Sequence, residues 1–329
     1  MTQFHFTRRA ALSALVAGAT TLASSYVQAQ SNSTPLRVIL PVGAGSGVDT
    51  IVRAAQNALS KALGGQAVVI ENLPGAGGIT GTQALIKAAP DGNTVAFISN
   101  NHSVNPSVFK SLPYDSLNDI TPISVVGGSP FVLVVNPAKV PVKTAKEMQA
   151  LLKSKPGSFN MASSGNGTII HLAGEMFVDA LGVQVQHVPY KGMGPMMTDI
   201  ISGQVEFGVA AVAAAQGQIS TGRLKAIGVL GKQRVASLPD VPTVAEQGFP
   251  DVDVAGWFAM IGPKALPASQ EKRLHDAVVT AFNDADVKAA MAKQDNFISP
   301  TTPDAAAKFL KAEQDRYARL VAKANIKIN

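Results

Sequence analysis

Residues 36–47 read LRVILPVGAGSG, an apolar run followed directly by a proline and a glycine-rich loop. A short continuous apolar run of this kind is typical of a strand that is buried on both faces of a sheet. Beyond the loop, apolar residues recur at helical spacing from Ile51 to Leu63, and the pattern ends at Gly64 and Gly65. The stretch therefore predicts a strand, a loop and a helix in direct succession.

The same unit recurs along the chain. A second strand is expected at 67–70, followed by a loop at 74–78 and a helix, and a third strand is expected at 94–98. Between 143 and 254 the succession of helices, strands and loops is repeated. Strands that alternate with helices and are continuously apolar indicate parallel sheets covered on both faces. We therefore predict an α/β fold with two lobes, each a mostly parallel sheet covered by helices.

Two extended segments that prolines flank, 131–135 and 252–258, are expected to carry the chain between the lobes. The first lobe would then comprise residues 30–134 and 256–329, and the second lobe residues 135–255. The chain has 329 residues, of which 46% are apolar and only 15% charged. This composition supplies enough apolar material for two cores.

Three loops rich in glycine or serine lie between a strand and a helix, at 41–47, 74–78 and 162–168. Loops of this kind lie at the carboxyl ends of parallel strands, where ligands bind. Glycine lets backbone N–H groups approach a ligand, and each following helix carries about half a positive charge at its N-terminus. The loops predict a site for a small anion, to which the first two contribute Gly43, Ala44, Gly45, Ser46, Gly75, Ala76, Gly77 and Gly78.

Two other interpretations of these loops stay open. The glycines could merely permit tight turns, and Asp49 could serve only to complement the helix dipole and order the loop. The spacing of Gly43, Gly45 and Gly47, with Glu71 at the end of the next strand, is close to a dinucleotide-binding fingerprint. That fingerprint requires G-x-G-x-x-G, which the loop lacks. A Rossmann-like enzyme that uses a dinucleotide is therefore the alternative function.

Motifs for catalysis or metal binding are weak. The sequence has no cysteine and no G-x-S-x-G, P-loop or H-E-x-x-H motif, so no catalytic residue, metal or cofactor is expected. His171 and Glu175 lie four residues apart on one expected helix, as a metal-binding pair or as polar groups of the helix or pocket. Asn101 follows the third strand, where it could line a cleft or form a turn. Tyr190 and Lys191 could place a cation near the cleft or lie in a solvated turn.

The N-terminal segment predicts export. Arg8 and Arg9 precede a short apolar run at 10–18, and residues 27–29 read VQA, which is typical of a signal-peptide cleavage site. We expect cleavage after Ala29 and a periplasmic protein, with Sec and twin-arginine export both open. The formal net charge of +6 is scattered along the chain without a basic stripe, so no nucleic-acid partner is expected.

Five ordered blocks resemble a known family. They read ENLPGAGG at 71–78, YDSLNDI at 114–120, GNGTIIHLAGE at 165–175, HVPYKG at 187–192 and LPDVPTVAE at 238–246. The blocks resemble the Bug-type receptors of tripartite tricarboxylate transporters, and the resemblance covers essentially all of the chain after the N-terminal segment. It implies a two-lobed periplasmic-binding-protein fold of the Venus-flytrap type. It also implies a monomer without catalytic residues that delivers a carboxylate to integral-membrane permease subunits.

The resemblance also implies where a ligand would bind. The first two glycine loops would hold one carboxylate end, partly through water. The other end would meet second-lobe positions, namely Ser163, Ser164, Thr168, Tyr190 and Ala210, and Asn101 and His171 are further candidates. Relatives often carry an aspartate that binds an amine where this chain has Ala210. We therefore expect a ligand without a free amine, either a di- or tricarboxylate or an aromatic carboxylate.

Overall fold

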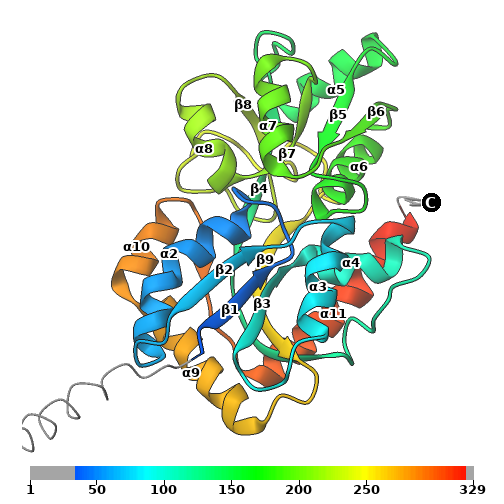
Figure 1. Ribbon diagram of the computed structural model, residues 1–329. Helices are drawn as coiled ribbons and strands as arrows, with labels where there is room; N and C mark the ends of the chain where they lie inside the picture. The colour runs from blue at the N-terminus through cyan, green and yellow to red at the C-terminus, as the bar shows by residue number, and fades with distance from the viewer. Residues whose placement is uncertain (1–33, 324–329) are drawn as a thin grey trace, which may run out of the picture. The chain divides into compact units, whose positions relative to one another are not determined.

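Two α/β lobes make up the part of the chain that the structure describes (Figure 1). The structure is a computed structural model and describes residues 34–323. The signal peptide expected at 1–29 lies outside the described residues. Among them, no helix combines the length and the apolar character that a membrane span requires.

The sheet of the first lobe begins with three parallel strands. These are β1 (Leu36–Leu40), β2 (Val68–Asn72) and β3 (Thr94–Ser99). Two strands antiparallel to their neighbours, β9 (Ala255–Pro263) and the 16-residue β4 (Ile120–Val135), complete the order β2-β1-β3-β9-β4. Because the loops after β1, β2 and β3 all leave the carboxyl ends of parallel strands, they lie at one edge of this sheet.

Side chains of β1 alternate between the two faces of this sheet, as successive side chains of a strand do. Val38 and Leu40 belong to the core on one face, and Ile39 belongs to the core on the other. The first face is covered by α2 (Gly47–Ala62), α9 (Ala268–Asn283) and α10 (Ala285–Ala292). The second is covered by α3 (Ile79–Ile86), α11 (Pro303–Lys323) and, beside α11, α4 (Asn100–Val108). Burial on both faces explains why the strand is continuously apolar.

The second lobe is built on four short strands and the end of β4. The strands are β5 (Asn160–Ser163), β6 (Gln186–Pro189), β7 (Phe207–Ala211) and β8 (Lys225–Leu230). β5 is parallel to β6 and β7, whereas β7 and β8 run antiparallel to β4. The helices are α5 (Ala145–Ser154), α6 (Ile169–Leu181), α7 (Met193–Ser202) and α8 (Val212–Ser220). Helices and strands enclose one continuous apolar core.

β4 carries the chain between the lobes without interruption. Its residues 120–130 pair with β9 and, at one end, with the two-residue β10 (Phe297–Ile298), whereas residues 131–135 pair with β7 and β8. The sequence predicts a crossing at 131–135, but these residues already belong to the second-lobe sheet. The segment expected to cross back, 252–258, differs too, because β9 starts at Ala255 and pairs only with first-lobe strands. Pairing satisfies the backbone groups of 131–135 and 255–258, which would otherwise be buried without partners.

Candidate ligand-binding site

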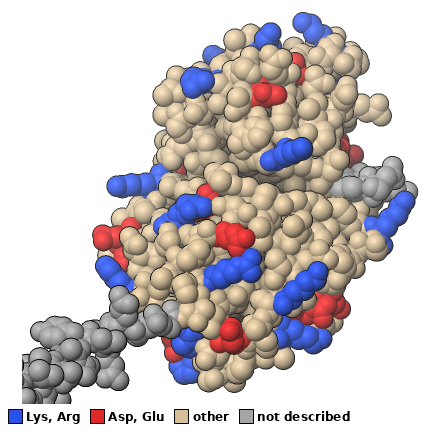
Figure 2. Space-filling view, in the orientation of Figure 1, with Lys and Arg blue, Asp and Glu red and all other residues tan. Residues whose placement is uncertain are grey.

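A cavity of about 580 Å³ lies between the two lobes, within the size range of small-molecule sites. Its first-lobe wall comes from the loops after β1, β2 and β3, and its second-lobe wall from the segments after β5, β6 and β7. On the face of the molecule shown in Figure 2, charged side chains of both signs are scattered. That face therefore carries no basic stripe of the kind that binds nucleic acid.

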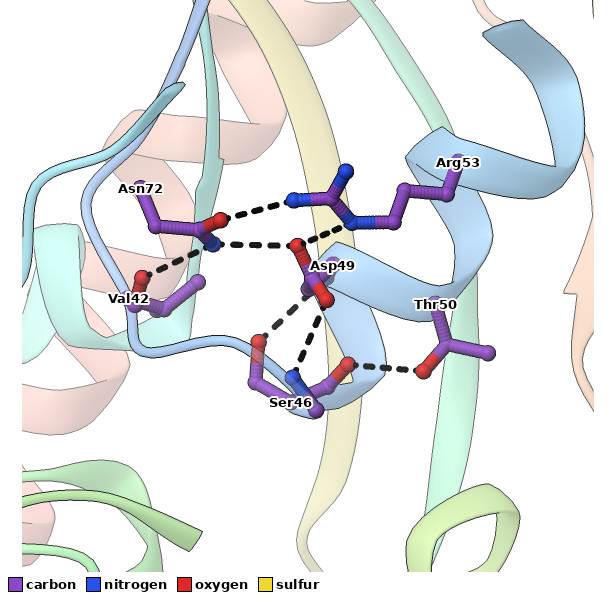
Figure 3. A network of polar contacts seen from close by, with 7 residues as sticks. Val42, Ser46, Asp49, Thr50, Arg53 and Asn72 are labelled. Atoms are coloured by element: carbon purple, nitrogen blue, oxygen red, sulfur yellow. Dashed lines mark hydrogen bonds and ion pairs between the residues drawn. The ribbon is translucent and has the colours of Figure 1, made fainter. Parts of the chain in front are cut away.

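A buried carboxylate, Asp49, holds the loop after β1 in place (Figure 3). Its Oδ2 accepts the N–H of Gly45 at 3.0 Å, and its own N–H donates to Ser46 Oγ at 3.3 Å, so Ser46 caps α2. Asp49 Oδ1 accepts from Arg53 Nε at 2.9 Å and from Asn72 Nδ2 at 3.0 Å. The loop is thus fastened both to the first turns of α2 and to the end of β2.

Arg53 compensates the negative charge of Asp49. Asp49 is only 5% exposed, and Arg53 forms an ion pair with it while donating a further bond to Asn72 Oδ1 at 2.8 Å. An unpaired buried carboxylate at this position would repel an anion in the loop. With Asp49 neutralised, the N-terminus of α2 sets the local potential, and this end of a helix favours negative charge.

The loop after β2 forms a tight turn against the loop after β1. It contains one 3₁₀ turn, η1 (Ala76–Gly78), in which the φ of Gly77 is 65° and that of Gly78 is 96°. A Cβ on Gly78 would lie only 2.9 Å from the carbonyl oxygen of Pro41, so the approach of the two loops requires glycine. Asn105 Nδ2 donates to the carbonyl oxygen of Gly77 at 3.2 Å and fastens the turn to α4.

Backbone donors from these two loops are free. The N–H groups of Gly47 and Val48, at the start of α2, have no acceptor among the described residues, and the same holds for Ala76 and Gly77. All four residues line the cavity. Unpaired N–H groups at a helix N-terminus and in a glycine turn are the arrangement that binds carboxylates and phosphates without a cationic side chain.

The loop between β5 and α6, in contrast, uses several of its donors within the protein. Thr168 caps α6, because its Oγ1 accepts the N–H of His171 at 3.2 Å. The N–H of Gly167 donates to His171 Nδ1 at 3.2 Å, and the N–H of Gly165 donates to Ser163 Oγ at 3.2 Å. These bonds hold the loop in shape and engage the N–H groups of Gly165 and Gly167.

Asn101 joins the two lobes. Its Oδ1 accepts the N–H of Ile169, the first residue of α6, at 2.7 Å. The preceding Asn100 is anchored, since its Nδ2 donates to the hydroxyl of Tyr317 in α11 at 2.6 Å and its Oδ1 accepts the N–H of Trp257 in β9 at 3.0 Å. Asn101 therefore extends from a rigid part of the first lobe toward the second.

Two stacked histidines support the second-lobe loop from behind. The ring centroids of His171 and His187 are 3.7 Å apart, and the rings are nearly parallel. Ser163 Oγ lies 2.6 Å from His187 Nε2, and His171 Nε2 lies 3.4 Å from a carboxylate oxygen of Glu175. Burial, reinforced by the neighbouring His171, lowers the pKa of His187 to about 4, so His187 is neutral at pH 7. Within residues 34–323, no three His, Cys, Asp or Glu side chains are arranged so that they could hold a metal ion.

The cavity brings together most of the residues that the sequence proposes for the site. Those that line it are Gly43, Ser46, Gly75, Ala76, Gly77, Gly78, Asn101, Ser164, Thr168 and Tyr190. Ala44 and Gly45 are exposed in the loop after β1 and do not line the cavity. Gly45 instead donates to Asp49 and helps to set the loop's shape.

Three predicted second-lobe residues lie behind the cavity wall. Ser163 is fully buried beneath the loop, and His171 faces the loop's backbone. Ala210 is also fully buried, opposite Val132 in the sheet, and the next residue, Ala211, lines the cavity in its place. Because side chains alternate along a strand, Ala210 and Ala211 face opposite sides of the sheet.

Apolar residues that the sequence does not single out also line the cavity. They are Phe109, Phe131, Ile170, Met193 and Phe258. Each lies in or beside an apolar run, where it reads as an ordinary core residue. The one signal that could identify Phe131 and Phe258 is their place in the segments expected to cross between lobes, because those segments must border an interlobe cleft.

Comparison with known proteins assigns the family. Residues 51–326 match the family model described as the tripartite tricarboxylate transporter family receptor. The chain belongs to this family. It is 33% identical over 296 residues to protein BugT of Bordetella pertussis, an alignment that covers 89% of this chain and 90% of BugT.

Solved structures agree with the family assignment. The periplasmic binding protein BugD is 30% identical with a TM-score of 0.85, covering 89% of this chain and 99% of BugD. MatC from Rhodopseudomonas palustris, solved with bound malate, is 27% identical with a TM-score of 0.82, covering 87% of this chain and 98% of MatC. The predicted two-lobed periplasmic-binding-protein fold is confirmed. Receptors of this family are solute-binding proteins and not enzymes, which excludes the alternative of a dinucleotide-dependent enzyme.

Proposed function

We propose that this receptor captures a small carboxylate in the cavity between its lobes and delivers it to the permease subunits of a tripartite tricarboxylate transporter. It would do so in the periplasm and as a monomer, after removal of residues 1–29. The two lobes, which the sequence divides near 134/135 and 255/256, would close on the ligand. Malate in the related MatC supports a carboxylate as the class of ligand.

The free N–H groups of the first lobe carry this proposal. The donors of Gly47 and Val48 at the start of α2, and of Ala76 and Gly77 in η1, line one side of the cavity. A carboxylate has two oxygens and about four acceptor sites, which suits a set of fixed donors from two loops. The positive end of the α2 dipole also attracts the carboxylate. Arg53 compensates the negative charge of Asp49, which would otherwise repel it.

The second lobe would contact the remainder of the ligand. Ser164, Thr168 and Tyr190 line the cavity opposite the glycine loops. Asn101, which already spans the lobes, would stay at the boundary between them and become enclosed on closure. Closure would exclude water, which strengthens the bonds to the carboxylate.

Calorimetry with matched acid and amide pairs tests the proposal. We expect at least one small carboxylate to bind with a micromolar or tighter Kd, and its uncharged amide to bind at least 100-fold more weakly. Thermal unfolding should shift upward with the acid alone. Absence of binding by every aliphatic and aromatic carboxylate tested, or equal binding of acid and amide, would refute the carboxylate site.

A glycine substitution localises the site. Gly77→Val introduces a branched side chain at a φ of 65°, where a Cβ would lie 2.9 Å from Asn105 Oδ1, and should reduce acid binding to below detection. Gly194→Ala, in α7 where a Cβ would meet no atom within 4 Å, is the matched control and should keep full affinity. Retained affinity in a folded Gly77→Val protein would move the site elsewhere.

A further inference from the structure

One wall of the cavity is apolar and comes from β4, β7 and β9. Phe131 lies opposite Ala211 in the pairing of β4 with β7. A Cβ on Gly47 would lie 3.6 Å from the methyl group of Ala211 and 3.5 Å from the ring of Phe258. Phe131, Ala211 and Phe258, which we call the apolar wall, therefore lie directly beside the start of α2 and its free donors. Ile170 from α6 adds a further apolar side chain to the cavity lining.

Charge around the cavity suits a single negative charge. Lys191 is the one charged residue among the described residues that line it, and its side chain is exposed. No lining residue within this range is acidic, so an ammonium group would have no counter-ion there. A second carboxylate placed on the apolar wall would lose its hydration without a partner, which costs several kcal/mol.

Several polar groups of the second lobe are already engaged, which leaves fewer donors for a second carboxylate. The N–H of Ile169 donates to Asn101, and that of Gly167 to His171. The hydroxyl of Tyr190 donates to Asp199 Oδ2 at 2.9 Å, so Asp199 acts on the tyrosine and not on a ligand. A second carboxylate could use these particular groups only by breaking one of these bonds.

We propose that the bound acid is an aromatic monocarboxylate, an inference that rests on the carboxylate-binding function proposed above. Its carboxylate lies on the free N–H groups of the first-lobe loops, and its ring lies on the apolar wall. The rings of Phe131 and Phe258 supply the edges and faces on which an aromatic ring packs better than a polar chain does. This choice separates the aromatic acids from the di- and tricarboxylates that the sequence leaves equally open.

Calorimetry on the unaltered protein tests the inference with four acids: benzoate, malate, adipate and citrate. We expect benzoate to bind at least tenfold more tightly than each of the other three. Binding of malate, adipate or citrate as tight as that of benzoate, or tighter, overturns the aromatic monocarboxylate and leaves the carboxylate receptor standing. Absence of binding by all four overturns both. This comparison uses only the unaltered protein, so its outcome does not depend on whether a variant folds.

A charge placed on the apolar wall provides a second test. Ala211→Asp should weaken benzoate binding at least 30-fold, because it sets a carboxylate beside the ligand's ring and close to its own carboxylate. Ala307→Asp adds the same charge on an exposed position of α11 and should leave the affinity unchanged within twofold. Thermal unfolding without ligand identifies a variant that fails to fold. Equal benzoate affinity in folded Ala211→Asp and the control overturns the assignment of the apolar wall.

Replacement of one aromatic ring of the apolar wall provides a third test. Phe131→Leu keeps an apolar side chain in the core and removes only the ring, so it should fold and should lose at least fivefold in benzoate affinity. Phe297→Leu makes the same change at a phenylalanine that is 53% exposed and does not line the cavity, and should bind normally. Unchanged affinity in Phe131→Leu overturns the stacking of the ligand's ring on this residue.

Discussion

Asn101 Oδ1 accepts the backbone N–H of Ile169 at 2.7 Å, so a side chain of the first lobe occupies the first donor of the second-lobe helix α6. The bond joins the lobes across the cavity. It also removes from the cavity a donor that a carboxylate could otherwise use. One residue therefore acts both on how the lobes meet and on which end of the site attracts an anion.

Loss of this interlobe bond should favour the open receptor. Asn101→Ala removes the acceptor and leaves the N–H of Ile169 to water, at a cost of about 1 kcal/mol to the closed arrangement. We expect small-angle scattering to give a larger radius of gyration for the unliganded variant than for the unaltered protein. Asn283→Ala, on the exposed surface of α9, is the control and should scatter like the unaltered protein. Identical scattering of both variants would mean that the bond does not influence closure.

Removal of the Asp49 charge should destabilise the first glycine loop. Asp49→Asn keeps the shape but places an amide against Arg53 and weakens the bonds to Gly45 and Asn72, so we expect a loss of about 2–3 kcal/mol in the free energy of unfolding. Urea denaturation measures this loss of free energy of unfolding. Asp240→Asn changes an exposed carboxylate and should have an effect within about 0.5 kcal/mol. Equal stability of the two variants would show that Asp49 does not order the loop.

The close approach of the two first-lobe loops should not tolerate a methyl group. Gly78→Ala places a Cβ 2.9 Å from the carbonyl oxygen of Pro41 at a φ of 96°, and should lower stability by about 2–4 kcal/mol and weaken acid binding. Gly217→Ala lies in α8 with no atom within 4 Å of its Cβ. That control should gain about 0.5–1 kcal/mol from the better helix propensity of alanine. A Gly78→Ala protein as stable as the control would contradict the loop contact.

Acidification should destabilise the receptor. Burial lowers the pKa of His187 and of His102 from 6.5 to about 4, and for His187 the neighbouring His171 adds to the effect. Between pH 6.5 and about 4, these histidines are protonated in the unfolded chain but neutral in the folded chain. The free energy of unfolding is therefore highest above pH 6.5 and falls as the pH drops toward 4. The slope is at most about 1.4 kcal/mol per pH unit for each histidine.

Urea denaturation at pH 7.5, 6 and 5 checks this dependence. His187→Gln keeps a polar partner for Ser163 but cannot take up a proton, so it should show a shallower loss of stability on acidification than the unaltered protein. His275→Gln, at a histidine that borders Thr301 and Asp276 outside the cavity, serves as the matched control and should keep the original slope. A His187→Gln protein with the full slope would contradict the depressed pKa of His187.

Much of the fold is readable from local pattern. The apolar runs at 36–40, 67–70 and 94–98 predict β1, β2 and β3 because a strand buried on both faces has no polar alternation. α4 is different, since Asn100, Asn101 and the internal Pro106 argue against a helix, and only its packing on α11 decides otherwise. The unbroken length of β4 is also hidden, because its pairing partners lie far away in the sequence.

The sequence by itself determined the glycine loops, the two α/β lobes and the family, because each depends on residues that are neighbours in the chain. Only the tertiary structure decided which donors stay free. The N–H groups of Gly47 and Ala76 lack acceptors within residues 34–323, whereas Ile169 donates to Asn101, a residue far away in the sequence. Long-range packing also decides that Ala211, and not Ala210, lines the cavity. Strand alternation is local, but the face that meets the cavity is set by long-range packing.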